Sequence, residues 1–294
     1  MIHSFTIKDL ENLSGIKAHT IRIWEQRYSF LKPCRTGTNI RYYSNEELKK
    51  LLNVALLNKY GIKISHIDKM EEGEMKEKIL SLNHLQAQQE RIVNELIQNM
   101  VDLDIEKFEA ILDNFIMTRG IERAIQQIIF PYLEKIGILW LTNHINPAQE
   151  HLVTNIIRQK LIVGIEGIVR SVKVNKTVLL FLPEGEYHEL GLLFMLYLLK
   201  SRGINTIYLG SSTPLEDVEY IVKLKKIDFL YCHLTAVGHK FNFDQFITHI
   251  TKNFNGIPMI ISGQLTHSYE KKIHHPISFK RSFAEVMEFV SGLK

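Results

Sequence analysis

The chain has 294 residues, enough for two or three domains that each bury a core of their own. Its hydrophobic fraction of 45% and charged fraction of 23% are ordinary for a globular protein, and no apolar run approaches the roughly 20 residues that cross a bilayer. Because the first residues lack the apolar stretch of a signal peptide and the two cysteines lie far apart, we expect a cytoplasmic protein rather than a membrane or secreted one.

The net charge of +4 is distributed unevenly along the chain. Residues 1–64 carry eleven Lys and Arg against five Asp and Glu, a balance of +6, so residues 65–294 sum to −2. Such an asymmetry is typical of a nucleic-acid-binding segment attached to a nearly neutral body. The alternative is a chance excess of solvated lysines.

Two short helices joined by a turn are predicted near the N-terminus. The first covers Ile7–Leu13, the second covers Lys17–Arg27, and Ser14 and Gly15 form the turn. This is the spacing of a helix-turn-helix, in which the second helix enters the major groove of DNA. The apolar face of the second helix, which we expect to pack in the core, consists of Ala18, Ile21 and Trp24.

A β-hairpin wing is predicted next, with Gly37 at the tip of two short extended runs within Arg35–Tyr43. Ser44 and Glu47 form a capping box that starts another helix. Helix, wing and capped helix in this order resemble the winged-helix domain of the MerR-type transcriptional regulators. The resemblance implies that the recognition helix and the wing grip double-stranded DNA. By position, the implied DNA contacts are His19, Thr20, Arg22, Arg27, Arg35, Arg41 and Tyr42.

The middle of the chain is predicted to be helical. An acidic, glycine-broken patch at residues 71–74 separates it from the basic N-terminal domain, to which we assign residues 1–72. Four long helices predict a small bundle over residues 76–172. The predicted helices are Lys76–Met100, Ile105–Thr118, Ile121–Leu141 and Pro147–Val169.

Trp140 is followed, after nine residues, by Glu150 and His151. Taken alone, these residues indicate a core tryptophan and a solvated helical turn. Their spacing resembles the Trp-x9-Glu-His motif of the MerR-type regulators with a C-terminal cobalamin domain, the CarH/LitR group. The resemblance implies that Trp140, Glu150 and His151 form a cap above cobalt, around an adenosyl group. Light-sensing members carry a histidine directly after the tryptophan, whereas Leu141 in this position cannot ligate cobalt and His144 lies three residues further on.

Strands and helices alternate from residue 175 to residue 294, which predicts a parallel sheet with right-handed crossovers and a flavodoxin-like strand order. The predicted fold class is therefore multidomain α + α/β. The predicted strands are Thr177–Leu182, Thr206–Leu209, Phe229–Leu234, Pro258–Ser262 and Pro276–Phe279. The predicted helices are Glu189–Ser201, Pro214–Lys225, Phe243–Phe254 and Phe283–Val290.

His188 lies on the loop after the first of these strands, at the sheet edge where open α/β sheets bind ligands. A neutral imidazole there could ligate a metal, with Glu186 placed to orient the ring and Gly191 allowing a bulky ligand close to the backbone. The alternative is a solvated loop histidine. The pattern acidic-x-His-x-x-Gly resembles the cobalamin-binding motif, which implies that His188 replaces the cofactor's own base beneath cobalt.

Two later segments hold the nucleotide tail of the cofactor in the family that the chain resembles. A serine follows the third strand there, but His233 stands in its place, before Leu234 and Thr235. A Gly-Gly pair follows the fourth strand, but the chain has Ser262 and Gly263. The added bulk in a tight tunnel costs about 1–3 kcal/mol of binding. The loop after the second strand matches the family, so the implied cofactor-binding residues here are Gly210, His233, Thr235 and Gly263.

The leading hypothesis is a DNA-binding transcriptional regulator rather than an enzyme. A corrinoid, adenosylcobalamin in particular, would lie between the helical bundle and the α/β domain and control a homo-oligomer, dimer or tetramer, on its operator. A second hypothesis, based on His233 and Ser262, keeps the regulator but not the cobalamin: the pocket has drifted and either senses another molecule or only supports dimerisation. His188 and His233 could then form a metal or regulatory site for another ligand. A third is a corrinoid methyl carrier, against which the winged helix argues.

Overall fold

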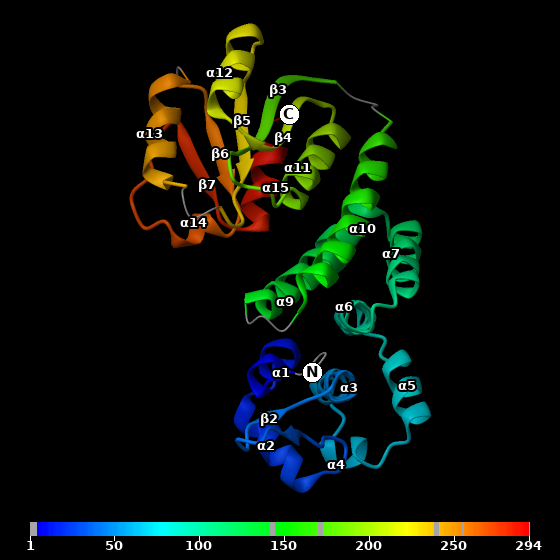
Figure 1. Ribbon diagram of the computed structural model, residues 1–294. Coiled ribbons are helices and arrows are strands. Elements are labelled where there is room, and N and C mark those ends of the chain that lie inside the picture. Colours follow the sequence, from blue (N-terminus) through cyan, green and yellow to red (C-terminus); the bar gives the residue numbers. More distant parts are fainter. Residues whose placement is uncertain (1–4, 142–144, 170–172, 238–240, 255, 294) are drawn as a thin grey trace. The chain divides into compact units, whose positions relative to one another are not determined.

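The chain forms the multidomain α + α/β fold that the sequence predicts, with an all-helical part carrying a small wing and a parallel sheet towards the C-terminus (Figure 1). The computed structural model describes residues 5–141, 145–169, 173–237, 241–254 and 256–293. Two compact units comprise Met1–Ile157 and Arg158–Lys294. The division into three domains at 1–72, 76–172 and 175–294 remains a prediction. No helix in the described ranges combines the length and apolarity that crossing a membrane requires.

The winged-helix part of the first unit begins with local capping signals. Thr6 caps the first helix in a capping box with Asp9, and Ser44 forms another with Glu47. Ile21 and Trp24 are buried, as the predicted apolar face of the second helix requires. The elements are α1 (Ile7–Ser14), α2 (Ala18–Arg27), β1 (Cys34–Arg35), β2 (Arg41–Tyr42), α3 (Asn45–Lys59) and α4 (Ile64–Ile67).

The remaining helices of the first unit differ from the prediction in one place. The single helix predicted over Lys76–Met100 is wrong, because the chain leaves the helical path at residues 81–84. Ser81 and Asn83, which bond readily to nearby backbone, weaken the helix there. The elements are α5 (Glu72–Leu80), α6 (Leu85–Asp102), α7 (Ile105–Arg119), α8 (Ile121–Ala124), a π-helical segment η1 (Ile125–Ile129), α9 (Phe130–Leu141) and α10 (Pro147–Glu166).

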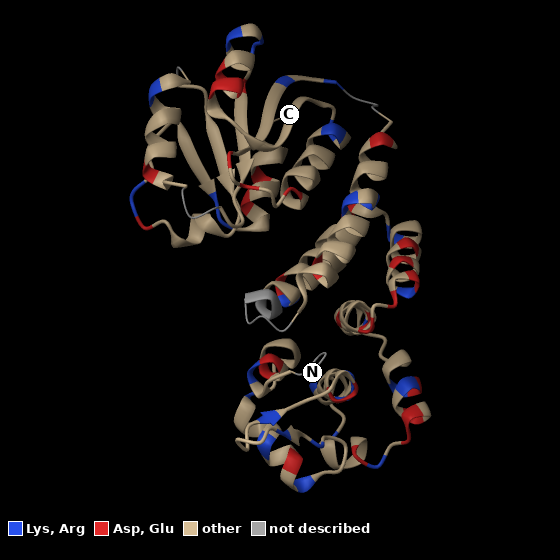
Figure 2. Cartoon of the chain, viewed as in Figure 1, with Lys and Arg blue, Asp and Glu red and all other residues tan. Residues whose placement is uncertain are grey.

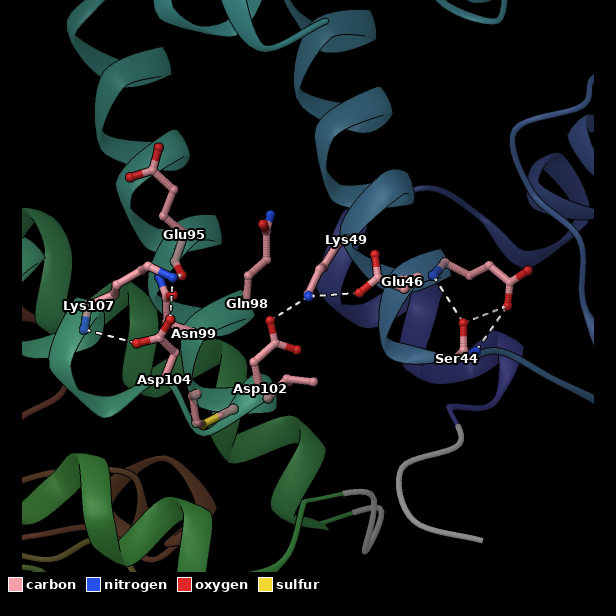
Figure 3. A network of polar contacts seen from close by, with 12 residues as sticks. Ser44, Glu46, Lys49, Glu95, Gln98, Asn99, Asp102, Asp104 and Lys107 are labelled. Atoms are coloured by element: carbon pink, nitrogen blue, oxygen red, sulfur yellow. Dashed lines mark hydrogen bonds and ion pairs between the residues drawn. The ribbon is translucent and has the colours of Figure 1, made fainter. Parts of the chain in front are cut away.

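A polar seam joins α3 of the winged helix to α6 of the helical bundle (Figure 3). Lys49 forms an ion pair with Asp102 and lies 3.0 Å from Glu46. Further along the two helices, the amides of Asn53 and Gln98 are 3.4 Å apart. At the far end, Lys59 lies 2.6 Å from Glu90. Polar contacts at both ends thus connect the winged helix to the bundle.

The second unit has the predicted flavodoxin-like strand order, β4-β3-β5-β6-β7, with all pairs parallel. Helices cover both faces of the sheet (Figure 1). The core on one face includes Val218, Phe246 and Ile250 of the second and third helices. The strands are β3 (Val174–Pro183), β4 (Ile204–Thr213), β5 (Phe229–His233), β6 (Met259–Ser262) and β7 (Ile277–Lys280). The helices are α11 (Leu190–Ser201), α12 (Leu215–Leu224), α13 (Phe243–Asn253), α14 (Leu265–Ser268) and α15 (Phe283–Ser291).

Candidate functional site

The candidate site lies at the carboxyl ends of β3 and β5, two neighbouring strands whose connections leave the sheet in opposite directions. At such a switch point the loops diverge and leave an opening that binds ligands in open α/β sheets. The loop after β3 carries His188, and the loop after β5 carries Thr235. The strand order therefore brings together residues that are nearly fifty positions apart in the sequence.

Glu186 connects these two loops. One carboxylate oxygen, Oε1, accepts hydrogen bonds from the backbone N–H of His188 at 2.9 Å and lies 2.7 Å from Nδ1 of the same residue. The other oxygen, Oε2, accepts from the backbone N–H groups of Thr235 at 2.8 Å and Ala236 at 2.9 Å. Glu186 is fully buried, so it serves as an internal clamp rather than as a surface charge.

The charge of Glu186 determines which nitrogen of His188 can bind a metal. Burial raises the pKa of the Glu186 carboxyl, but the hydrogen bonds from His188 and Thr235 outweigh burial and hold that pKa below its usual value. An ionised Glu186 can only accept, so in the neutral ring of His188 the proton lies on Nδ1 and the lone pair on Nε2. The side chain of His188 is 50% exposed. The pair thus has the arrangement of a metal-ligating histidine and the carboxylate that orients it.

His233, at the end of β5, turns towards α11 instead. An added Cβ on Gly191 would meet Cδ2 of His233 at 2.3 Å and Nε2 at 2.5 Å, so the imidazole lies directly against the Gly191 backbone. The close approach expected at Gly191 is therefore made by a side chain of the protein. Nδ1 of His233 is 2.8 Å from Oγ of Ser262, which is 2.5 Å from the hydroxyl of Tyr231. These three side chains are called the His233 triad below.

The two remaining predicted tail residues are glycines at tight positions. Gly210 lies in β4 with a positive φ of 86°, and an added Cβ would be 3.3 Å from Oε1 of Glu189. The same oxygen accepts a hydrogen bond from Tyr208 at 2.7 Å. Gly263 follows β6 with a φ of 99°, and an added Cβ would be 2.3 Å from the carbonyl oxygen of Leu234. Gly263 thus allows the ends of β5 and β6 to approach each other closely, whereas Gly210 leaves room for the side chain of Glu189.

The His233 triad predicts a loss of stability in acid. Burial lowers the pKa of His233 to about 4, an effect that His188 adds to and Glu186 opposes. A histidine whose pKa is lower in the folded than in the unfolded chain favours folding at neutral pH, and this contribution disappears as the pH falls from about 6.5 to 4. We expect His233 to account for about 2 kcal/mol of lost unfolding free energy over that range.

The measurement is urea denaturation of the wild type and of His233→Ser at pH 7 and pH 4. Other groups titrate over the same range in both proteins, so the comparison isolates His233. A loss of stability that is equal in the two proteins would contradict the prediction.

The predicted cap residues lie in helices α9 and α10. Glu150 is half-buried on α10, and its Oε2 lies 3.1 Å from Nδ1 of the exposed His151. Trp140 lies in α9, but its side chain falls outside the described residues, and so does His144. The cap therefore remains a prediction from the sequence motif.

The predicted DNA contacts divide into exposed residues and residues with partners inside the protein. His19, Arg22 and Arg27 are exposed on α2, the predicted recognition helix. Arg41 of the wing donates from Nε to Glu25 at 3.0 Å, and Glu25 also accepts a hydrogen bond from buried Tyr43. Arg35 donates to the side chain of Asn39 at 2.7 Å. Thr20 and Tyr42 are half-buried, and Figure 2 shows basic residues distributed over the winged-helix elements.

Some of the site's residues were not predicted from the sequence. Tyr231 and the backbone of Ala236 belong to the site, and only the bulk of Ser262 was noted. Tyr231 lies in a largely apolar strand, so the sequence around it did not indicate that its hydroxyl group bonds with Ser262. The described residues contain no group of three or more His, Cys, Asp or Glu that could hold a metal ion.

Comparison with protein families places two known modules in the chain. Residues 5–74 match the MerR HTH family of regulatory proteins. Residues 92–163, which include α7, α8 and α9, match a B12 binding domain. The parallel sheet and His188 lie outside both matched segments.

Two proteins of Myxococcus xanthus are similar to the chain. The chain is 28% identical to the HTH-type transcriptional repressor CarA of Myxococcus xanthus over 210 residues, which cover 71% of this chain and 68% of CarA. It is 24% identical to the HTH-type transcriptional repressor CarH of the same organism over 277 residues, or 91% of each chain.

Among solved structures, the Methanosarcina barkeri monomethylamine corrinoid protein is similar, with a TM-score of 0.50. The alignment covers 69% of this chain and 99% of that protein at 13% identity, so the likeness concerns the fold alone.

Proposed function

We propose that this chain, a MerR-type transcriptional regulator with a cobalamin-binding domain, binds operator DNA under the control of a corrinoid ligated by His188. The observation that carries the proposal is the Glu186–His188 pair at the switch point of the sheet. A buried carboxylate that fixes the tautomer of a half-exposed histidine serves a metal centre better than it serves a surface loop.

The Glu186–His188 pair fits a corrinoid that is ligated through a protein imidazole. His188 would supply the lower nitrogen ligand, and Glu186 would hold its ring upright by accepting from Nδ1. When bound, a corrinoid would supply a cobalt centre that accepts the imidazole of His188 and can exchange a further ligand. Trp140, Glu150 and His151 would contact the opposite face, a role supported by their sequence motif.

Regulation would follow from differential binding to two states of the protein. A ligand shifts an equilibrium only if it binds one state more tightly than the other. The polar seam connects α3 of the winged helix to α6 of the bundle, which is a route by which a change in the bundle would reach the DNA-binding helices. We propose that the corrinoid changes how subunits associate and thereby how α2 and the wing engage DNA.

The finer identity of the ligand is also proposed. The sequence motif of the cap supports an adenosyl group on the upper face of cobalt. Leu141 stands where light-sensing members have a histidine, so we propose a response to the presence of the corrinoid rather than to light. An oligomer, dimer or tetramer, is proposed as the species that binds DNA.

The test is retention of a corrinoid by the purified full-length chain in the dark. The protein is mixed separately with hydroxocobalamin, adenosylcobalamin and aquocobinamide, a corrinoid without the nucleotide base, and is then desalted. We expect at least one visible corrinoid band to stay with the wild type and its retention to fall at least about tenfold in His188→Ala. His267→Ala, which replaces an exposed histidine on α14, is the matched control and should retain as much as the wild type.

A wild-type chain that retains none of the three corrinoids would overturn the proposal. So would equal retention by His188→Ala and the wild type. Binding of DNA from upstream of the protein's own gene, measured by mobility shift with and without the retained corrinoid, then tests whether the ligand controls the winged helix.

A further inference from the structure

The space on the lower side of the proposed corrinoid site is filled by the protein itself. His188 and Gly191 lie on the loop and first turn of α11, and the imidazole of His233 covers Gly191 from the strand side. The position of an added Gly191 Cβ lies only 2.3–2.6 Å from three ring atoms of His233. There is less room than one methyl group needs between the helix and the ring.

Hydrogen bonds also hold the imidazole of His233 in this position. Nδ1 of His233 is hydrogen-bonded with Ser262, and Ser262 is in turn bonded with Tyr231. Tyr231 and Ser262 are buried, so moving the ring would leave polar groups inside the core without a partner. The His233 triad therefore resists rotation of the ring out of this space.

A flat base on the cofactor would compete for this position. If His188 takes the lower face of cobalt, the cofactor's own base cannot ligate and must be placed elsewhere on the same side of the corrin ring. Next to His188, the space for such a base would be the gap between α11 and the end of β5. The imidazole of His233 already occupies this gap, so a base placed there would have to displace it.

We propose that His233 makes the site selective for corrinoids whose lower tail lacks a nucleotide base. The inference rests on the proposed function, since it concerns the ligand of that same site. The ligand class is a corrin ring ligated by His188, with the tail truncated or kept outside the protein. Overfilling a packed site weakens binding by about tenfold to a hundredfold, which is the discrimination we expect from His233.

The experiment measures the dissociation constants of aquocobinamide and hydroxocobalamin by visible absorbance, in the dark, with the full chain. The base of hydroxocobalamin has to leave cobalt before His188 can bind, which favours cobinamide in any protein. Because the cost of removing the base from cobalt is a property of hydroxocobalamin, it is the same for every variant of the protein. It therefore cancels when the ratio of the two dissociation constants is compared between variants. The variants are His233→Ser, which keeps a small polar side chain at this position, and His233→Ala.

We expect the preference for cobinamide to fall by about tenfold to a hundredfold in both variants. The change should come from tighter binding of hydroxocobalamin, with cobinamide binding altered less than about threefold. His267→Ser should leave both constants unchanged. Thermal melts of all variants at pH 7 verify that the proteins compared are folded.

The outcomes separate the inference from the proposed function. If the wild type binds neither corrinoid and also retains no adenosylcobalamin, the proposed function itself fails. If it retains adenosylcobalamin alone, which carries the nucleotide base, only the selectivity is overturned. If it binds both, but the ratio is the same in His233→Ser, His233→Ala and the wild type, only the selectivity of His233 is overturned. If one variant does not fold, the ratio in the other decides.

Discussion

Replacing Gly263 with alanine is expected to lower the unfolding free energy of the α/β unit by at least about 3 kcal/mol. Gly263 has a φ of 99°, a conformation that costs an L-residue about 1–3 kcal/mol. The added Cβ would also lie 2.3 Å from the carbonyl oxygen of Leu234 and 2.8 Å from its backbone nitrogen. Backbone atoms cannot rotate away as a side chain can, so the ends of β5 and β6 would have to separate.

The matched control is Gly256→Ala in the same unit. Gly256 has a φ of 73°, but an added Cβ there meets nothing within 4 Å. The Gly256→Ala substitution should therefore lower the unfolding free energy only by the backbone strain, about 1–2 kcal/mol. Urea unfolding followed by circular dichroism measures both variants. Equal costs would mean that the contact with Leu234 is relaxed without penalty, contrary to this prediction.

Replacing Glu186 with alanine is expected to abolish corrinoid retention and to destabilise the α/β unit by about 3 kcal/mol. The substitution removes the acceptor for the backbone N–H groups of His188, Thr235 and Ala236. Each buried donor left without a partner costs about 1–3 kcal/mol, although water can reach part of this loop. The ring of His188 would also lose the group that holds its orientation.

Two further substitutions show whether the clamp acts through its charge. Glu186→Gln keeps an oxygen acceptor but loses the negative charge, and we expect an intermediate loss of stability and of corrinoid retention. Glu184→Ala, two residues earlier and exposed, should change stability by less than about 0.5 kcal/mol. Retention by Glu186→Ala at the wild-type level would show that His188 needs no orienting partner.

The winged helix was predictable because its signals are local. Ser44 and Glu47 form the capping box that their spacing indicates, and Ile21 and Trp24 are buried as their helical spacing requires. The break between α5 and α6 was missed, because Ser81 and Asn83 weaken a helix only slightly and packing against α3 decides the outcome. The partnership of Arg41 with Glu25 was also missed, since sixteen residues separate the two side chains.

Within the site, the sequence alone determined the residue types and the loop that carries them. An acidic residue two positions before a histidine, between a strand and a helix, was sufficient to predict Glu186 as the orienting partner of His188. The strand order was predicted as well, because alternation of strands and helices permits few parallel arrangements.

Only the tertiary structure determined which residues of the site are in contact with each other. The sequence indicated that His233 adds bulk, but the direction of its ring depends on Ser262 and Tyr231, which the sheet brings to it. The amides of Thr235 and Ala236 reach Glu186 for the same reason, since β3 and β5 are neighbours in space although fifty residues apart. Local patterns specify which chemistry a segment can offer, whereas the packing of strands and helices determines whether that chemistry faces a ligand or another side chain.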